Sequence, residues 1–136
     1  MTHEGTRTAT CSCGQFKVTL QGDPAFVNMC NCYDCQVRSG SAFQLAAFFR
    51  EEQLVRDDGD RTTYARPTDT GRLINLQFCP TCGVSVVFRP EMRPGMVGVH
   101  GGCFADRTFT VPTRILYADR AHPWVSLPEA EIIPHV

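Results

Sequence analysis

Short segments in which apolar and polar residues alternate recur along the chain. Apolar side chains occupy every second position in residues 16–20, 43–49, 74–78 and 84–88. A period of two is typical of strands that bury one face, so the sequence predicts strands in these segments. Weaker candidates for strands are residues 53–56, 62–66, 96–99 and 113–117.

Helical signals are few. Residues 32–39 could form one short helix that ends at Gly40, and residues 51–54 could form a single helical turn. Clusters of Gly, Pro and Asp at 57–60, 66–71 and 93–95 mark turns between the segments. We therefore expect a mostly β fold of several small antiparallel sheets with one or two short helical turns.

Length and charge narrow the class of protein. The 136 residues suit one domain spanning 1–136, and 43% of them are hydrophobic, which is enough for a packed core. A net charge of -1 argues against a nucleic-acid partner. No apolar run reaches the roughly 20 residues of a membrane helix, and the N-terminal residues show no secretory signal. The expected location is therefore cytoplasmic, with no membrane partner.

Cysteines carry the candidate chemistry. Seven of the eight lie in three clusters, Cys11-x-Cys13, Cys30-x-Cys32-x-x-Cys35 and Cys79-x-x-Cys82. Such spacings allow the sulfurs of one tight turn to reach a single ion, and zinc prefers four ligands in a tetrahedron. A glycine follows each outer pair (Gly14 and Gly83), as a turn that needs positive φ requires.

The clusters divide unequally between two sites. The two outer pairs supply four sulfurs and would close a structural zinc site at Cys11, Cys13, Cys79 and Cys82. The middle cluster supplies only three, which is typical of a catalytic zinc with an open position. Three alternatives stay open: disulfides or free core thiols, a second closed site completed by Cys103 or a histidine, and a different grouping of the cysteines.

Four segments together resemble the glutathione-dependent formaldehyde-activating (Gfa-like) family, which has the Mss4-like fold. Three are the cysteine clusters with their flanking residues: 11–16, 30–36 followed by Gly40-Ser41-Ala42-Phe43, and 78–83. The fourth is His122-Pro123-Trp124-Val125, which is similar to the closing motif of the family. The resemblance covers most of the chain, so a single zinc-stapled domain with a core of about residues 8–128 is expected.

The resemblance also implies an activity. Two zincs per chain are expected, one structural at the outer cysteines and one catalytic at Cys30, Cys32 and Cys35. The activity would be that of a carbon–sulfur lyase that joins glutathione and formaldehyde to give S-(hydroxymethyl)glutathione. The expected partners are thus a small thiol and a small aldehyde.

Glutathione carries two carboxylates, so its site should offer cations or backbone amides. Arg38 is the nearest cation to the middle cluster, with Arg72, Arg89 and Arg114 as weaker candidates, and Gly40 and Ser41 could line the same pocket. Asn31 and Gln36 stand where the family often has histidine and a basic residue, which leaves the substrate open.

Two other functions are compatible with these residues. One is a non-catalytic zinc-binding module of Mss4-like fold that recognises a protein or a small thiol. The other is a secreted protein stapled by disulfides, which would hold no zinc. Cys103 matches no ligand of the family, and His100 follows an apolar segment in which a core histidine is expected.

Overall fold

The computed structural model of the protein describes residues 4–134, which form eleven strands, one α-helix and three 3-10 turns. In chain order these are β1 (Thr6–Thr10), β2 (Lys17–Gln21), β3 (Phe26–Cys30), α1 (Tyr33–Ser39), β4 (Gln44–Arg50), η1 (Glu51–Gln53), β5 (Leu54–Asp58), β6 (Thr62–Pro67), β7 (Leu73–Phe78), β8 (Ser85–Pro90), β9 (Met96–His100), η2 (Gly101–Phe104), β10 (Arg114–Leu116), η3 (Ala118–Arg120) and β11 (Glu131–Ile133).

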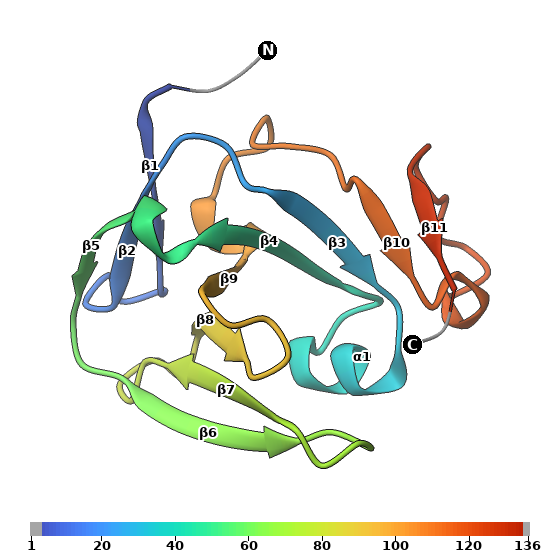
Figure 1. The fold of residues 1–136 in the computed structure, drawn as a ribbon, viewed down its shortest axis with the longest axis horizontal. Helices are drawn as coiled ribbons and strands as arrows, with labels where there is room; N and C mark the ends of the chain where they lie inside the picture. Colours follow the sequence, from blue (N-terminus) through green and yellow to red (C-terminus); the bar gives the residue numbers. More distant parts are fainter. Residues whose placement is uncertain (1–3, 135–136) are drawn as a thin grey trace.

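The strands form two sheets (Figure 1). The smaller has three strands in the order β1-β2-β5, and the larger has eight in the order β11-β10-β3-β4-β9-β8-β7-β6. The mostly β fold is therefore as predicted, but one sheet is large. Two of its pairings, β10 with β3 and β10 with β11, are parallel, whereas the others are antiparallel.

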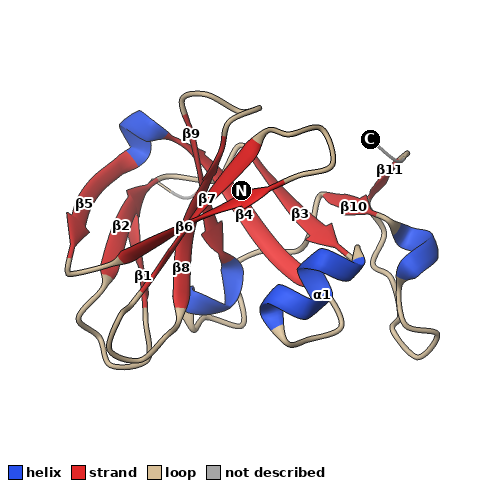
Figure 2. Ribbon diagram, turned by 90° about the horizontal axis from the view of Figure 1, so that it is seen from below, coloured by secondary structure: helices blue, strands red, loops and turns tan. Residues whose placement is uncertain are grey.

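The long connection between β3 and β10 allows these two strands to pair in parallel. β3 ends at Cys30 and β10 begins only at Arg114, so the chain crosses most of the domain before it returns to lie beside β3. A tight hairpin can join only antiparallel strands, and parallel neighbours need such a long crossover. Figure 2 shows β10 beside β3. The segment after β10 reaches the helix that follows β3, where Gln36 Nε2 donates to the Arg120 carbonyl at 3.1 Å.

Strand β4 is buried on both faces and separates two apolar clusters. Ala47 and Phe49 belong to the main core, which the smaller sheet completes with residues such as Val18. Ala46 and Phe48 point to the opposite face and form a second cluster with Leu76, Phe88 and their neighbours. Because successive side chains of a strand alternate between faces, the second cluster becomes the floor on which the candidate site is built.

The predicted helix is present as α1. Cys32 caps its start, where the Cys32 sulfur accepts a hydrogen bond from the Cys35 N–H at 3.4 Å. Gly40 ends it in the left-handed conformation with φ of 63°, and its N–H bonds to carbonyls of the last turn. The predicted turn after β4 is the 3-10 turn η1. Within residues 4–134, no helix has the length and apolarity needed to span a membrane.

Candidate metal centre and substrate cavity

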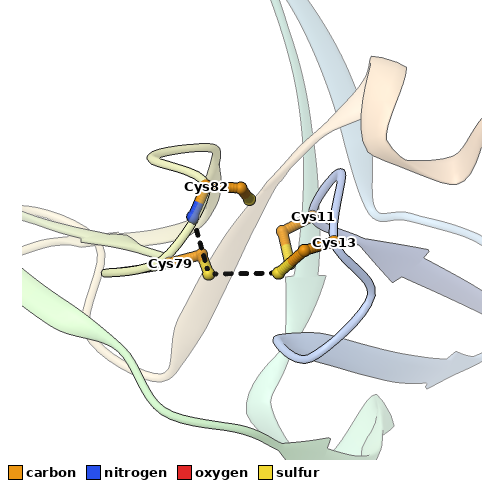
Figure 3. Close-up of side chains that lie close together, drawn as sticks. All are labelled: Cys11, Cys13, Cys79 and Cys82. Carbon is orange, nitrogen blue, oxygen red and sulfur yellow. Dashed lines mark hydrogen bonds between the residues drawn. The ribbon is translucent and has the colours of Figure 1, made fainter.

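Four cysteine sulfurs meet between the two sheets (Figure 3). Cys11 and Cys13 lie in the turn from β1 to β2, and Cys79 and Cys82 lie in the turn from β7 to β8. The sulfur atoms of Cys11 and Cys13 are 3.6 Å apart, and those of Cys13 and Cys79 are 3.7 Å apart. A tetrahedral zinc with Zn–S bonds near 2.3 Å needs sulfurs about 3.8 Å apart. The donor set therefore fits such an ion.

The turns that carry these cysteines have the predicted form. Gly14 and Gly83 have φ of 83° and 81°, a region that favours glycine. The Cys11 N–H bonds to the Phe16 carbonyl at 3.0 Å, and the Cys79 N–H bonds to the Val84 carbonyl at the same distance. Each pair of sulfurs is thus presented by a short hydrogen-bonded loop.

Hydrogen bonds from the protein stabilise negative charge on the sulfurs. The Cys79 sulfur accepts from Gln15 Nε2 at 3.0 Å and from the N–H groups of Thr81 and Cys82 at 3.3 and 3.4 Å. Desolvation opposes ionisation of Cys79, but these donors lower its pKa to about 6. A thiol with such a pKa is a ready metal ligand at neutral pH.

The three remaining clustered cysteines form a second group. Cys30 is the last residue of β3, Cys32 caps α1, and Cys35 lies in the first turn of α1. Their sulfurs all lie within 4.8 Å of one another. Among residues 4–134, no further cysteine, histidine or carboxylate joins either group.

Charge in this second group concentrates on one sulfur. Hydrogen bonding from Cys30 and Cys35 outweighs burial and lowers the pKa of Cys32 to about 2, with help from the Cys35 N–H and from the positive charge of Arg66. The pKa of Cys30 is raised, because it shares hydrogen bonds with Cys32 and Cys35 and because it is buried. All eight cysteines lie in the described part of the chain, and all have free thiols rather than disulfides.

A cavity of about 650 Å³ opens beside the three sulfurs. Its floor is the second apolar cluster, from which Phe48 and Phe88 face the cavity with their rings in edge contact at 5.5 Å. Its walls carry five arginines against two aspartates, Asp34 and Asp69. The arginines are Arg38, Arg66, Arg72, Arg93 and Arg120.

Several elements bring these arginines together. Arg66 lies at the end of β6 and reaches across to Asp34 of α1, with which it forms an ion pair at 3.1 Å. Arg120 follows β10 and lies over the rings of Tyr33 and Tyr117 at 5.1 and 4.8 Å. Arg93 lies over Phe26 at 4.7 Å. The cavity is therefore a cationic pocket assembled from several separate segments between residues 28 and 120.

Arg38 is a largely buried arginine of this cavity. It donates a hydrogen bond to Gln44 Oε1 and lies over the Phe88 ring at 5.4 Å. Its Nε and Nη1 atoms are enclosed. Burial lowers the pKa of Arg38, and the neighbouring charge of Cys35 opposes that change. Arg72, by contrast, is exposed.

Other residues selected from the sequence lie outside the cavity walls. Gly40 ends α1, and the exposed Ser41 donates its N–H to Ser39 Oγ at 3.2 Å. Neither is among the lining residues, and the same holds for Arg89, which pairs with Glu51 at 2.5 Å, and for Arg114. Binding of the substrate by Gly40 and Ser41 stays a prediction.

Asn31 and Gln36 point away from the cavity and tie α1 to the later chain. Asn31 is fully buried, and its Nδ2 donates to the Leu116 carbonyl at 3.0 Å. Gln36 Nε2 donates to the carbonyls of Asn31 and Arg120 at 2.8 and 3.1 Å, and Gln36 Oε1 lies 3.1 Å from His122 Nε2. These two departures from the family pattern thus hold the helix in place rather than changing the cavity wall.

Two further residues have clear positions. Cys103 belongs to neither cysteine group; its sulfur donates to the Ser85 carbonyl at 3.5 Å, and burial raises its pKa to about 11. His100 lies at the end of β9 against Phe88, with ring centres 5.2 Å apart, and its Nε2 is enclosed. Burial lowers the pKa of His100 to about 4, so it is neutral at pH 7.

Sequence reasoning missed two buried polar residues of the cavity, Asn28 and Gln44. One signal was available for Asn28, because it precedes Cys30 by two positions and so shares a strand face with it. Gln44 lies directly opposite Cys30 in the β3–β4 pairing, which the sequence alone does not reveal.

Comparisons with known proteins identify a family and a similar structure. The family model described as glutathione-dependent formaldehyde-activating enzyme matches residues 6–120, a span that includes both cysteine groups. A crystal structure of a protein from Rhodobacter sphaeroides is similar, with a TM-score of 0.55 and 26% identity over 71% of this chain and 85% of that one. None of the curated proteins matches the sequence.

Proposed function

Because the chain belongs to the glutathione-dependent formaldehyde-activating enzyme family, we propose that it is a zinc-dependent carbon–sulfur lyase. Its substrate would be the adduct of a thiol and an aldehyde, with glutathione and formaldehyde as the pair that the family suggests. The observation that supports this proposal most is the group of three sulfurs that opens on a cationic cavity without a fourth protein ligand among residues 4–134.

Two zinc ions fit the two donor sets. Cys11, Cys13, Cys79 and Cys82 would enclose a structural ion that joins the two sheets. Cys30, Cys32 and Cys35 would hold the second ion, which supplies a Lewis acid able to keep a thiol deprotonated or to polarise a carbonyl.

The cavity suits an anionic thiol. Arg72, Arg93 and Arg120 surround it, and guanidinium groups bind carboxylates through paired hydrogen bonds. These arginines would hold the two carboxylates of glutathione and orient its sulfur toward the cysteine group. Phe48 and Phe88 would keep water from the opposite side.

The reaction needs no oxidant or reductant. In the synthetic direction the thiol sulfur forms a bond to the carbonyl carbon, and the carbon–oxygen π bond breaks. The proton of the thiol ends on the new hydroxyl oxygen. Because thiols add to formaldehyde without help, positioning of the two partners would supply much of the acceleration.

Exchange NMR between free glutathione and S-(hydroxymethyl)glutathione tests the proposal. The wild-type protein is expected to accelerate exchange above the rate in its absence, and Cys30→Ser to abolish the acceleration while the chain stays folded. Cys103→Ser is the matched control, since Cys103 lies outside both groups and should keep full activity. If Cys30→Ser changes only stability, the protein is instead a non-catalytic zinc-binding module.

A further inference from the structure

Asn28 is a buried polar residue that the proposed function leaves unexplained. It lies in β3 with only 7% of its surface exposed, lines the cavity, and has its Oδ1 atom enclosed without a hydrogen-bond partner among residues 4–134. An unpaired buried acceptor costs free energy, so such groups in native proteins usually serve a ligand or hold water.

Arg38 presents the complementary groups. Its Nη2 bonds to Gln44, but its Nε and Nη1 are enclosed and have no hydrogen-bond partner in the described part of the chain. A guanidinium group has five N–H donors, and no oxygen or nitrogen acceptor among the described residues serves the enclosed ones, whose only nearby acceptor is the Cys35 sulfur.

Strand pairing brings the two residues to the same part of the cavity. Asn28 and Cys30 share one face of β3, and Gln44 lies directly opposite Cys30 on β4. Because Arg38 is bonded to Gln44, its guanidinium group lies near Cys30 as well. An unpaired acceptor and unpaired donors therefore border the cysteine group together.

Resting on the proposed function, we propose that Asn28 and Arg38 form a hydroxyl site that holds the oxygen of the thiol–aldehyde adduct beside Cys30, Cys32 and Cys35. The Asn28 Oδ1 atom accepts a hydrogen bond from that hydroxyl group, and an Arg38 N–H donates a hydrogen bond to the hydroxyl oxygen. Arg38 is then a catalytic residue at the reacting atoms, which differs from the carboxylate anchor expected from the sequence.

The donors of Arg38 match the change in charge during the reaction. When the carbon–sulfur bond breaks, its electron pair leaves with the sulfur, and the hydroxyl proton is transferred to that sulfur to give the free thiol. The carbon–oxygen double bond forms at the same time, so negative charge develops on the oxygen before the aldehyde leaves. Preorganised donors aimed at such an oxygen are among the largest contributions to catalysis. Asn28 holds the neutral hydroxyl and so contributes to substrate binding.

Two measurements on the zinc-loaded protein test this assignment. The first is the exchange rate of S-(hydroxymethyl)glutathione, for which Arg38→Met should lower kcat about tenfold to a hundredfold and Arg38→Lys less. Asn28→Leu should mainly raise KM. The second is calorimetric binding of S-methylglutathione, which lacks the hydroxyl group and should bind all three variants as it binds the wild type.

The outcomes separate the possible roles. Weaker binding of S-methylglutathione by Arg38→Met would make Arg38 a carboxylate anchor and overturn the assignment. Unchanged kcat in Arg38→Met and unchanged KM in Asn28→Leu would also overturn it, although the proposed function would stand. A wild-type protein that accelerates no exchange would overturn both. Arg56→Met, which removes an exposed arginine outside the cavity, should match the wild type.

Discussion

Gln15 joins the four-sulfur group to the turn between β5 and β6. Its Nε2 donates to the Cys79 sulfur at 3.0 Å and to the Asp60 carbonyl at 2.7 Å, while its Oε1 accepts from the Asp60 N–H at 2.8 Å. One side chain thus supports a candidate metal ligand and fixes a loop from a distant part of the sequence.

Removal of the Gln15 side chain should weaken zinc binding at the four-sulfur group. Gln15→Ala leaves Cys79 with fewer donors, so the pKa of Cys79 should rise and zinc should pass more quickly to a competing chelator. Loss of the bonds to Asp60 should cost about 1–2 kcal/mol of unfolding free energy. The control is Gln21→Ala, which loses one exposed bond to the Glu4 carbonyl and no contact with sulfur. Equal rates of zinc transfer in the two variants would contradict the role of Gln15.

Gly59 lies in the same region and should not tolerate a side chain. Its φ is 103°, and a Cβ atom there would lie 1.9 Å from the Gln15 carbonyl oxygen. Gly59→Ala should therefore lower the unfolding free energy by at least about 3 kcal/mol. Gly71 has φ of 83° with open space around it, so Gly71→Ala should cost only about 1–2 kcal/mol. Urea unfolding measures both, and equal losses would refute the predicted clash.

The two cysteine groups should respond differently to substitution. Cys11→Ser removes a ligand from the site between the sheets, and a structural zinc contributes about 10–16 kcal/mol, as much as the net stability of a typical domain. We expect this variant to be unfolded or aggregated. Cys30→Ser should remain folded with about one zinc per chain, because only the cavity site is changed. Circular dichroism measures the folding of each variant, and metal analysis measures its zinc content. A folded Cys11→Ser variant with two zincs per chain would contradict the assignment of a structural site to the four outer cysteines.

His100 should make stability depend on pH. Its pKa is about 6.5 in the unfolded chain and is lowered to about 4 in the fold. The unfolded chain therefore binds a proton first as the pH falls, and this part of the stability is complete above about pH 6.5 and is lost toward about pH 4. The glutamine of His100→Gln does not titrate. Between about pH 7 and pH 5, this variant should therefore lose about 2 kcal/mol less unfolding free energy than the wild type. Equal losses of unfolding free energy in the wild type and His100→Gln would show that the fold does not lower the pKa of His100.

Strands whose sequence shows period-two alternation were predicted well, because this alternation is a local property. β2, β4, β7 and β8 lie where period-two patterns occur. β3 was missed because four of its five residues are buried, including the polar Asn28, so no alternation exists. β1 was missed because only Ala9 among its residues is buried. The parallel pairing of β10 depends on a contact with β3 far along the chain, which no local pattern reveals.

The candidate ligands were also local features, since each cysteine pair occupies one turn. The cavity was not, because Arg66 and Arg120 come from segments that only the folded chain brings to α1. Likewise, Asn31 and Gln36 looked like changes to the substrate site in the sequence. Their bonds to Leu116 and Arg120 depend on the return of the chain beside β3.

Cadmium NMR of the protein loaded with Cd²⁺ in place of Zn²⁺ tests most directly whether the two sulfur groups differ in their openness to substrate. Two signals are predicted, one from the four-sulfur group and one from Cys30, Cys32 and Cys35. Addition of glutathione should move only the second signal. A single signal, or two signals that glutathione leaves unchanged, would contradict the division between a closed structural site and an open catalytic one.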